Sequence, residues 1–290
     1  MGKSGRGSDN DIEAELRAAG QAPDDALDVA NLALAFAVAD RPGLSRATYQ
    51  EHLAELAAAA HEALSRQTTP ALTSDAGIVA TTLAGLISGR FGYRGDSETY
   101  DDLKNADLSH VIDRRKGLPV SLGILYLHLG RALDLDLAGL NFPGHFVLRL
   151  QIGASATIID PFNGGQTLST ADLLRLLRSI EGPAAQLSPE TYAPVGPRDI
   201  LLRLQNNILS RALKAGDHAR ARAVITRMIW LAPRRAGLQF ELGRLEVHAG
   251  HMSAAAQAFG ACRDMASGDG EMRIANMAAE ALRRLKTKLN

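Results

Sequence analysis

The chain has 290 residues, 46% of them hydrophobic and 22% charged, so we expect one or two packed globular domains. Its 32 basic residues balance its 32 acidic ones. The chain therefore lacks the excess positive charge of a general nucleic-acid-binding domain, and its charge gives no reason to expect attraction to an anionic membrane. The most apolar stretch, residues 118–140, carries three charged side chains and is not a membrane span. With Cys262 as the single cysteine and no secretory leader, we expect a cytoplasmic protein.

The N-terminal part is expected to be a lead followed by a helical layer. The first ten residues are rich in Gly, Ser and charge, which predicts a disordered lead that we extend over residues 1–23. Apolar residues then recur at helical spacing between turn-forming breaks. The pattern predicts three helices, over about residues 24–40, 46–65 and 75–90, which form a packing layer without chemistry of its own.

The middle of the chain changes character. Residues 91–105 are polar, aromatic and turn-rich, and Pro119 then marks the first turn of a helix because its missing N–H has no intrahelical partner there. Apolar runs rich in strand-forming residues follow. The predicted elements are a helix over about residues 119–133, strands over 137–142, 145–152 and 157–160, and a helix over about 170–180.

The C-terminal part is predicted to be a helical repeat. Residues 183–199 are rich in proline and read as a linker. Beyond it, Gly216 and Gly250 lie in similar turns 34 residues apart, each followed by an Ala-rich amphipathic helix. Thirty-four residues is the period of the tetratricopeptide repeat. We therefore expect residues 200–290 to form tetratricopeptide-like repeats that bind a protein or peptide partner, with no nucleic-acid or membrane partner.

Ser121 is a candidate nucleophile. It falls in the opening turn of the predicted helix over 119–133, where free N–H groups and a partial positive charge favour a developing anion. Serine at that place is also a favoured helix-capping residue. Position alone leaves both interpretations open.

His145 and Asp160 are candidates for the other two members of a catalytic triad. His145 opens a predicted strand after a Pro-Gly turn, and Asp160 ends the next strand. An aspartate that faces a histidine nitrogen sets its tautomer and supports the imidazolium. Taken singly, the histidine is a strand-edge residue and the aspartate a turn residue before proline.

Three sequence blocks carry a family resemblance. Arg-Lys-Gly-x-Pro-x-Ser, Pro-Gly-His-Phe and Ile-Asp-Pro-Phe, within about residues 90–169, resemble the SirB-type branch of the transglutaminase-like superfamily, whose core precedes tetratricopeptide-like repeats. The resemblance implies an α+β fold with a papain/transglutaminase-like core over 24–182, including the N-terminal helical layer. It aligns Ser121, His145 and Asp160 with the Cys–His–Asp triad and matches Asn105 to an asparagine common in this branch.

Serine in place of cysteine leaves two hypotheses. A serine hydroxyl cannot form the stable anion that a thiol forms, so thiolate-dependent transamidation is not expected. The first hypothesis is a non-catalytic regulatory or protein-binding module. The alternative is a serine-dependent amide or ester hydrolase or acyl-transferase, with Ser121 attacking, His145 as base and Asp160 orienting it. No cofactor fingerprint is present, and His248 and His251 flank a turn without the further ligands of a metal site, so neither cofactor nor metal is expected.

Overall fold

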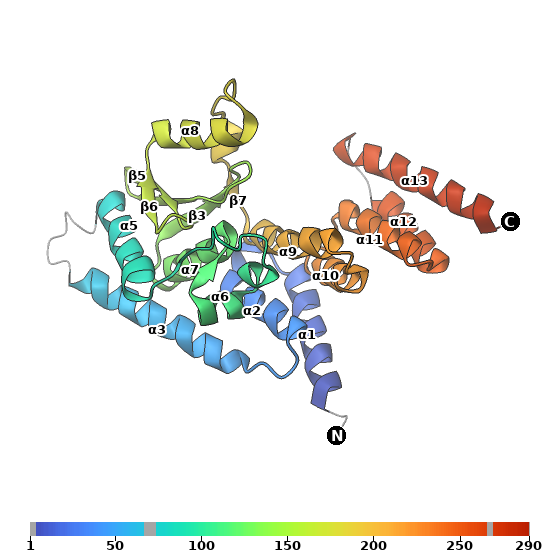
Figure 1. Cartoon of the computed structure of the whole chain (residues 1–290), viewed down its shortest axis with the longest axis horizontal. Coiled ribbons are helices and arrows are strands. Elements are labelled where there is room, and N and C mark those ends of the chain that lie inside the picture. Colours follow the sequence, from blue (N-terminus) through green and yellow to red (C-terminus); the bar gives the residue numbers. More distant parts are fainter. Residues whose placement is uncertain (1–3, 67–73, 266–268, 290) are drawn as a thin grey trace. The chain divides into compact units, whose positions relative to one another are not determined.

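The computed structural model describes residues 4–66, 74–265 and 269–289 (Figure 1). The chain divides into two compact units. One comprises residues 24–204, and the other comprises residues 1–23 together with residues 205–290.

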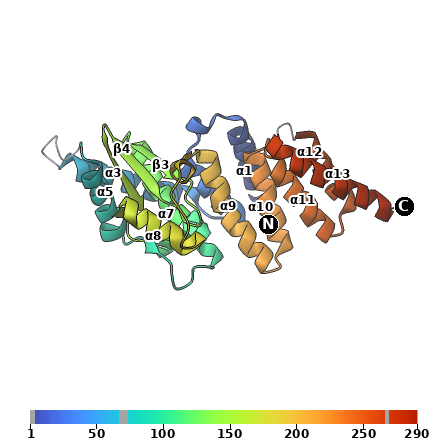
Figure 2. The ribbon, with the colours of Figure 1, turned by 90° about the horizontal axis from the view of Figure 1, so that it is seen from above.

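A five-stranded antiparallel sheet forms the centre of the first unit. Its order is β6-β5-β4-β3-β7. The strands are β3 (Asp136–Leu140), β4 (Leu148–Ile152), β5 (Ser155–Asp160), β6 (Gln166–Leu168) and β7 (Pro194–Val195). In the register Leu148 pairs with Ile159, which places the beginning of β4 beside the end of β5. Figure 2 shows β3 and β4 side by side.

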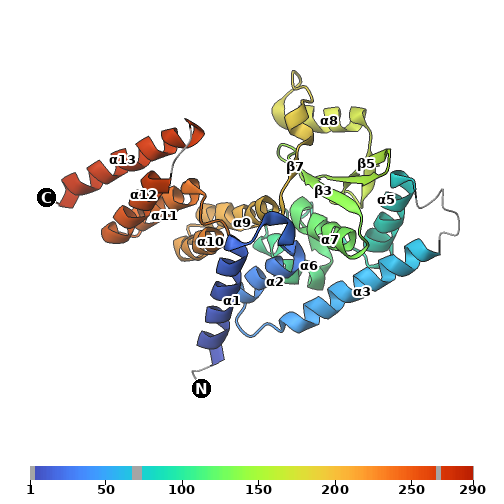
Figure 3. The same cartoon turned by 180° about the vertical axis from the view of Figure 1, so that it is seen from behind.

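Helices cover both faces of this sheet. Helix α8 (Thr170–Glu181) lies on one face, where its buried Leu173 and Leu177 pack with Leu140, Phe142 and Val147. Helix α7 (Pro119–Ala132) lies on the other face (Figure 3). Two glycines allow the close approach there, because a side chain at either Gly123 or Gly139 would overlap the Phe146 ring.

The predicted N-terminal layer consists of α2 (Val29–Asp40), α3 (Arg46–Ser65) and α5 (Ala76–Ala84), which continues as a π-helical turn (Gly85–Arg90). Helices α2 and α3 pack on α7, as does α6 (Leu108–Arg114), which follows the layer in the chain. Helix α5 packs on α3 and on strands β4, β5 and β6. Asp28 caps α2 by accepting the N–H of Asn31, and Asp75 caps α5 in the same way. The fold class expected for this unit, an α+β transglutaminase-like core with a helical layer, is confirmed.

A short parallel ladder joins the loops beside α7. Strand β1 (Arg94–Gly95) pairs with β2 (Lys116–Gly117), and a 3-10 turn (Leu103–Ala106) lies between them in the chain. The ladder brings the polar segment after residue 91 against the start of α7.

The predicted linker over 183–199 differs from the structure. This segment contains a 3-10 turn (Pro189–Tyr192) and strand β7, which pairs with β3 and completes the edge of the sheet. Helix α9 (Pro197–Lys214) follows at once. The prolines of the segment are compatible with this place at the edge of the sheet, since β7 is a two-residue edge strand in which Pro194 is exposed.

The second unit is helical. It contains the part of α9 from Gln205 onward, α10 (His218–Leu231), α11 (Ala236–His248), α12 (Met252–Met265) and α13 (Asp269–Leu289). Consecutive helices from α10 to α13 lie side by side (Figure 2). Gly216 and Gly250 both have positive φ and make the turns before α10 and α12, so the 34-residue spacing marks equivalent helix–turn–helix positions. No helix in the described part of the chain is both long and apolar enough to span a bilayer.

The disordered lead expected over residues 1–23 also differs from the structure. Ser4–Gln21 forms helix α1, and its Leu16 is fully buried. Helix α1 packs on α10 (Figure 3). There Gly20 meets the main chain of Trp230, and the Arg17 guanidinium lies 5.2 Å from the centre of the indole ring. A polar lead sequence thus becomes ordered because its few apolar residues find a partner surface on the repeat helices.

Candidate functional site

Ser121 lies in the first turn of α7 and is fully buried. Its hydroxyl donates to main-chain carbonyl oxygens, at 2.7 Å to Asn105 and 3.0 Å to Leu118. Leu118, not Ser121, holds the N-cap position of the helix. Ser121 therefore ties α7 to the preceding loop, and it does not cap the helix N–H groups.

Asn105 has a clear structural role. It is fully buried, and its amide donates to the carbonyl of Thr99 at 2.7 Å while its side-chain oxygen accepts from Arg114 at 3.1 Å. Its own carbonyl accepts from the Leu118 N–H as well as from the Ser121 hydroxyl. Asn105 is thus the centre of a hydrogen-bond network that fixes the loop before α7.

A buried carboxylate completes this network. Asp96 accepts from the Arg114 guanidinium at 2.9 Å and from the Thr99 hydroxyl at 2.6 Å. Burial alone would raise the pKa of Asp96, but the hydrogen bonds from Thr99 and Arg114 outweigh it and lower the pKa to about 2. Sequence reasoning missed Asp96 and Arg114. The dense polar run over 91–105 was the signal that could have found Asp96, whereas Arg114, at the end of α6, lies outside that run.

The structure brings His145 and Asp160 together. The Nε2 atom of His145 lies 2.9 Å from Oδ1 of Asp160, and both side chains are largely buried. Asp160 also accepts from the N–H groups of Phe162 and Asn163 and from the Asn163 amide at 2.8 Å. Burial favours a higher pKa for Asp160, but the hydrogen bond and charge of His145 and the bonds from Asn163 hold the pKa below its usual range. Asp160 is therefore ionised, and both of its carboxylate oxygens accept hydrogen bonds, one of which orients the imidazole of His145.

Aromatic rings cover the His145–Asp160 pair. Phe162 meets the His145 ring edge-on, with centroids 6.2 Å apart, and Tyr100 meets Phe162 at 5.9 Å. The Phe162 carbonyl accepts from the Gly95 N–H of strand β1 at 3.1 Å, and the neighbouring Asp96 N–H donates to Gly117. Strand β1 thus lies between the loop network of Ser121 and the turn that carries Asp160.

Arg203 holds the loop that carries His145. Its guanidinium, on α9, donates to the main-chain carbonyls of His145 and Phe142 and lies 5.5 Å from the centre of the Phe146 ring. Burial lowers the pKa of Arg203. This arginine was not anticipated from the sequence, because it lies 58 residues from His145 in the chain.

Tyr126 is a buried tyrosine beside the Asp160 turn. Its hydroxyl has no hydrogen-bond partner among the described residues, and burial together with the charge of Asp160 raises its pKa. A side chain on Gly165 would place its Cβ 2.1 Å from this hydroxyl. The two glycines after Asn163 therefore let the turn close over α7.

The three predicted site residues are thus only partly joined. His145 and Asp160 form a direct pair, whereas the hydrogen bonds of Ser121 end on carbonyl oxygens. Within the described part of the chain, no hydrogen bond connects Ser121 to His145. The described residues also contain no cluster of three or more His, Cys, Asp or Glu that could hold a metal ion.

Curated relatives cover part of the chain. It is 31% identical over 169 residues to a UPF0162 protein of Xylella fastidiosa, a match that covers 57% of this chain and 60% of that one. A UPF0162 protein of Vibrio cholerae is 40% identical over 114 residues, which cover 39% of this chain and 42% of the relative. Mouse F-box only protein 21 is 30% identical over 132 residues, 43% of this chain and 20% of its own. The chain thus spans less than two thirds of the length of these relatives, and no solved structure matches it.

Two family models cover most of the chain. A tetratricopeptide repeat model matches residues 208–285, which correspond to the end of α9 through most of α13. A model of the transglutaminase-like superfamily matches residues 47–206, more than half of the chain, which include the whole of the sheet, nearly all of α3, and helices α5 to α8. The chain therefore belongs to the transglutaminase-like superfamily.

Proposed function

We propose that this protein is a non-catalytic, cytoplasmic binding module of the SirB-type branch, whose repeats bind a protein or peptide. The observation that carries the proposal is the state of Ser121, which is fully buried and donates its hydroxyl hydrogen to the carbonyl of Asn105 at 2.7 Å. A serine nucleophile must instead give that hydrogen to a base during attack.

Activating Ser121 would carry a structural cost. Its bond to Asn105 belongs to the network that includes Arg114 and Asp96, and all of these groups support the loop before α7. Turning the hydroxyl toward His145 would remove a donor from that network. A serine also lacks the lowered pKa that makes a buried cysteine reactive beside an imidazolium.

The repeats supply the binding half of the proposal. Tetratricopeptide repeats expose extended surfaces for protein partners, and the repeat model covers residues 208–285. The balanced charge of the chain favours a protein or peptide over nucleic acid or a membrane surface.

The alternative is a serine-dependent hydrolase or acyl-transferase of amides or esters. It is favoured by one observation, the 2.9 Å contact between His145 Nε2 and Asp160 Oδ1, which is the base–orienter half of a triad. In this alternative α7 or the preceding loop would have to move so that the Ser121 hydroxyl leaves the Asn105 carbonyl and reaches the imidazole.

Covalent labelling separates the two functions. We expect a serine-reactive fluorophosphonate probe to label the native protein no more than the Ser121→Ala variant. Labelling that depends on Ser121 and disappears in His145→Ala would establish the hydrolase instead.

A thiol scan tests the burial on which the proposal depends. In a Cys262→Ala background, the Ser121→Cys variant should react with iodoacetamide far more slowly than a Ser65→Cys control, because Ser65 lies at the exposed end of α3. Equal reactivity of the two thiols would show that position 121 is open to reagents and would count against the proposal.

A further inference from the structure

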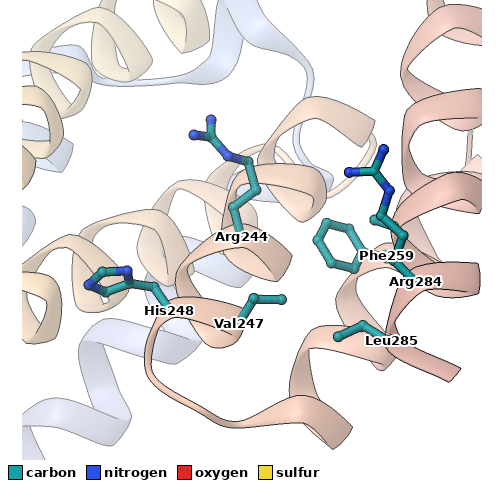
Figure 4. A pocket seen from close by; sticks show the side chains of 7 residues that line it. Arg244, Val247, His248, Phe259, Arg284 and Leu285 are labelled. Atoms are coloured by element: carbon teal, nitrogen blue, oxygen red, sulfur yellow. The ribbon is translucent and has the colours of Figure 1, made fainter. Parts of the chain in front are cut away.

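A cavity of about 710 Å³ opens in the repeat unit, within the range of ligand-binding sites. Residues from α11, α12 and α13 line it (Figure 4): Arg244, Val247, His248, Phe259, Ala281, Arg284 and Leu285. It lies outside the His145–Asp160 region, and all of its lining residues belong to the second unit.

The floor of this cavity is apolar. Phe259 and Leu285 are buried, and the partly buried Val247 packs against the hydrophobic cluster to which they belong. Phe259 reaches α11 because Gly243 has no side chain there; a Cβ on Gly243 would lie 2.6 Å from the ring. The floor is thus a fixed hydrophobic surface created by a small residue on α11.

The rim carries two exposed arginines. The side chains of Arg244 and Arg284 are 63% and 77% exposed, and Figure 4 shows both guanidinium groups extending to the same side of the apolar floor. The described residues that line the cavity include no carboxylate. The rim is therefore a place where an incoming carboxylate meets two guanidinium groups.

The glutamates that pair with these two arginines would compete only weakly with an incoming carboxylate. Arg244 pairs with Glu241 and Arg284 with Glu280, each on its own helix and exposed to solvent. Exposed pairs of this kind contribute little to stability, so a better-placed carboxylate can replace them at small cost.

The apolar surface continues beyond the cavity. Met277 is 44% exposed and lies one turn before Ala281 on the same face of α13. Methionine is common on surfaces that adapt to varied partners. An open apolar strip with a charged rim suits an extended or helical segment of a protein better than an enclosed small molecule.

We propose that the cavity and Met277, together the Arg244–Arg284 groove, bind a segment of a partner protein in which apolar side chains are flanked by carboxylates. The apolar side chains contact Phe259, Val247 and Met277, and the carboxylates pair with Arg244 and Arg284. This inference rests on the proposed binding function and names the chemistry of its partner.

The test uses three fluorescein-labelled dodecapeptides with the full-length protein: one with Leu among Glu and Asp, one with Leu among Lys, and one with Glu and Ser but no Leu. We expect fluorescence anisotropy to report saturable binding of the first peptide alone. Arg244→Glu and Arg284→Glu should each weaken it by about tenfold or more, and Met277→Ser by a smaller factor.

The matched control is Arg283→Glu, which makes the same charge change at an exposed residue that does not line the cavity. It should change the affinity by no more than about twofold. Circular dichroism and thermal melting of each variant confirm that the repeats remain folded.

Other outcomes overturn the inference. They are absence of binding by the first peptide, equal binding of the Lys-containing peptide, or an effect of Arg283→Glu as large as that of Arg284→Glu. Saturable binding of laurate that depends on both rim arginines, without peptide binding, would assign the groove to a small amphiphile. None of these results alters the labelling test at Ser121, so failure of this inference is distinguishable from failure of the proposed function.

Discussion

The hydroxyl of Ser121 donates to the main-chain carbonyl of Asn105, 16 residues earlier in the chain, at 2.7 Å. This contact fixes the loop before α7 to the first turn of that helix. It also occupies the one proton that a serine nucleophile would have to give to a base. The Ser121 hydroxyl is therefore both a structural hydrogen-bond donor and the group on which a serine-dependent reaction would depend.

Ser121→Ala should destabilise the core by about 1 kcal/mol, because a buried hydrogen bond is lost while the Asn105 carbonyl keeps the Leu118 N–H as a donor. Urea denaturation followed by far-UV circular dichroism measures the change. Ser179→Ala is the control. Its hydroxyl bonds a carbonyl at the same 2.7 Å distance but is exposed, so we expect a change within about 0.5 kcal/mol. A neutral Ser121→Ala would contradict the structural role.

Acid should weaken the core through Asp96. Its folded pKa of about 2 lies below the ordinary value of 3.8, so its contribution to stability is fully present above about pH 4 and is lost as pH falls toward 2. Thr99→Val removes the hydroxyl that donates to Asp96 at 2.6 Å and should raise this pKa toward its ordinary value. Less stability is then lost on acidification, and the loss is complete at a higher pH than in the native protein.

Urea denaturation at a series of pH values between 2 and 7 follows this effect. Thr81→Val provides the comparison, since the Thr81 hydroxyl donates to the Gly77 carbonyl and not to a carboxylate. Its pH profile should match that of the native protein. If Thr99→Val also keeps the native profile, Asp96 is not the group responsible.

Gly165→Ala should be far more damaging than Gly164→Ala. Both glycines have positive φ, so each substitution carries the strain of a left-handed backbone, about 1 kcal/mol. At Gly165 the new Cβ would also overlap the Tyr126 hydroxyl and Ala84, whereas at Gly164 the nearest atom, from Ser88, is 3.4 Å away. We expect Gly165→Ala to cost about 2 kcal/mol more, from chemical denaturation. Equal costs would show that the turn does not close on Tyr126.

Tyr126→Phe should leave stability unchanged or slightly raised. The Tyr126 hydroxyl is buried without a partner among the described residues, so its removal ends a desolvation cost and breaks no hydrogen bond. It should also recover part of the loss in Gly165→Ala, because it deletes the nearest overlapping atom. A double-mutant cycle between the two positions measures this coupling, and an additive result would disprove the contact.

Gly20→Ala should separate α1 from α10. A Cβ at Gly20 would lie 2.1 Å from the Trp230 carbonyl oxygen, which is main chain and cannot rotate away. We expect a loss of about 2 kcal/mol and a red shift in the emission of Trp230, the sole tryptophan. Gly260→Ala, at a helical glycine with open space around it, should instead stabilise by about 0.5–1 kcal/mol. If both variants behave alike, α1 is not docked where the structure places it.

The helices of the core could be predicted closely from local patterns. The segment Arg46–Ser65 matches its predicted bounds, and α7 begins at Pro119 as expected, because helical periodicity and a first-turn proline are local signals. Strand β7 and helix α1 could not be predicted in this way. Two residues carry no periodicity, and a polar lead is ordered only by the surface that it contacts.

The candidate site shows the same difference between features that local sequence patterns indicate and features that depend on tertiary contacts. The sequence by itself determined the residue types, the order of Ser121, His145 and Asp160 on helix and strands, and the resemblance to a transglutaminase-like core, because these depend on local blocks and turns. Only the tertiary structure decided the partners. Antiparallel pairing of β4 with β5 brings His145 to Asp160, while the loop network through Asn105 takes the Ser121 hydroxyl. A hydrogen-bond partner is set by proximity in space, and Asn105 and Arg203 reach the site from segments that no local pattern connects to it.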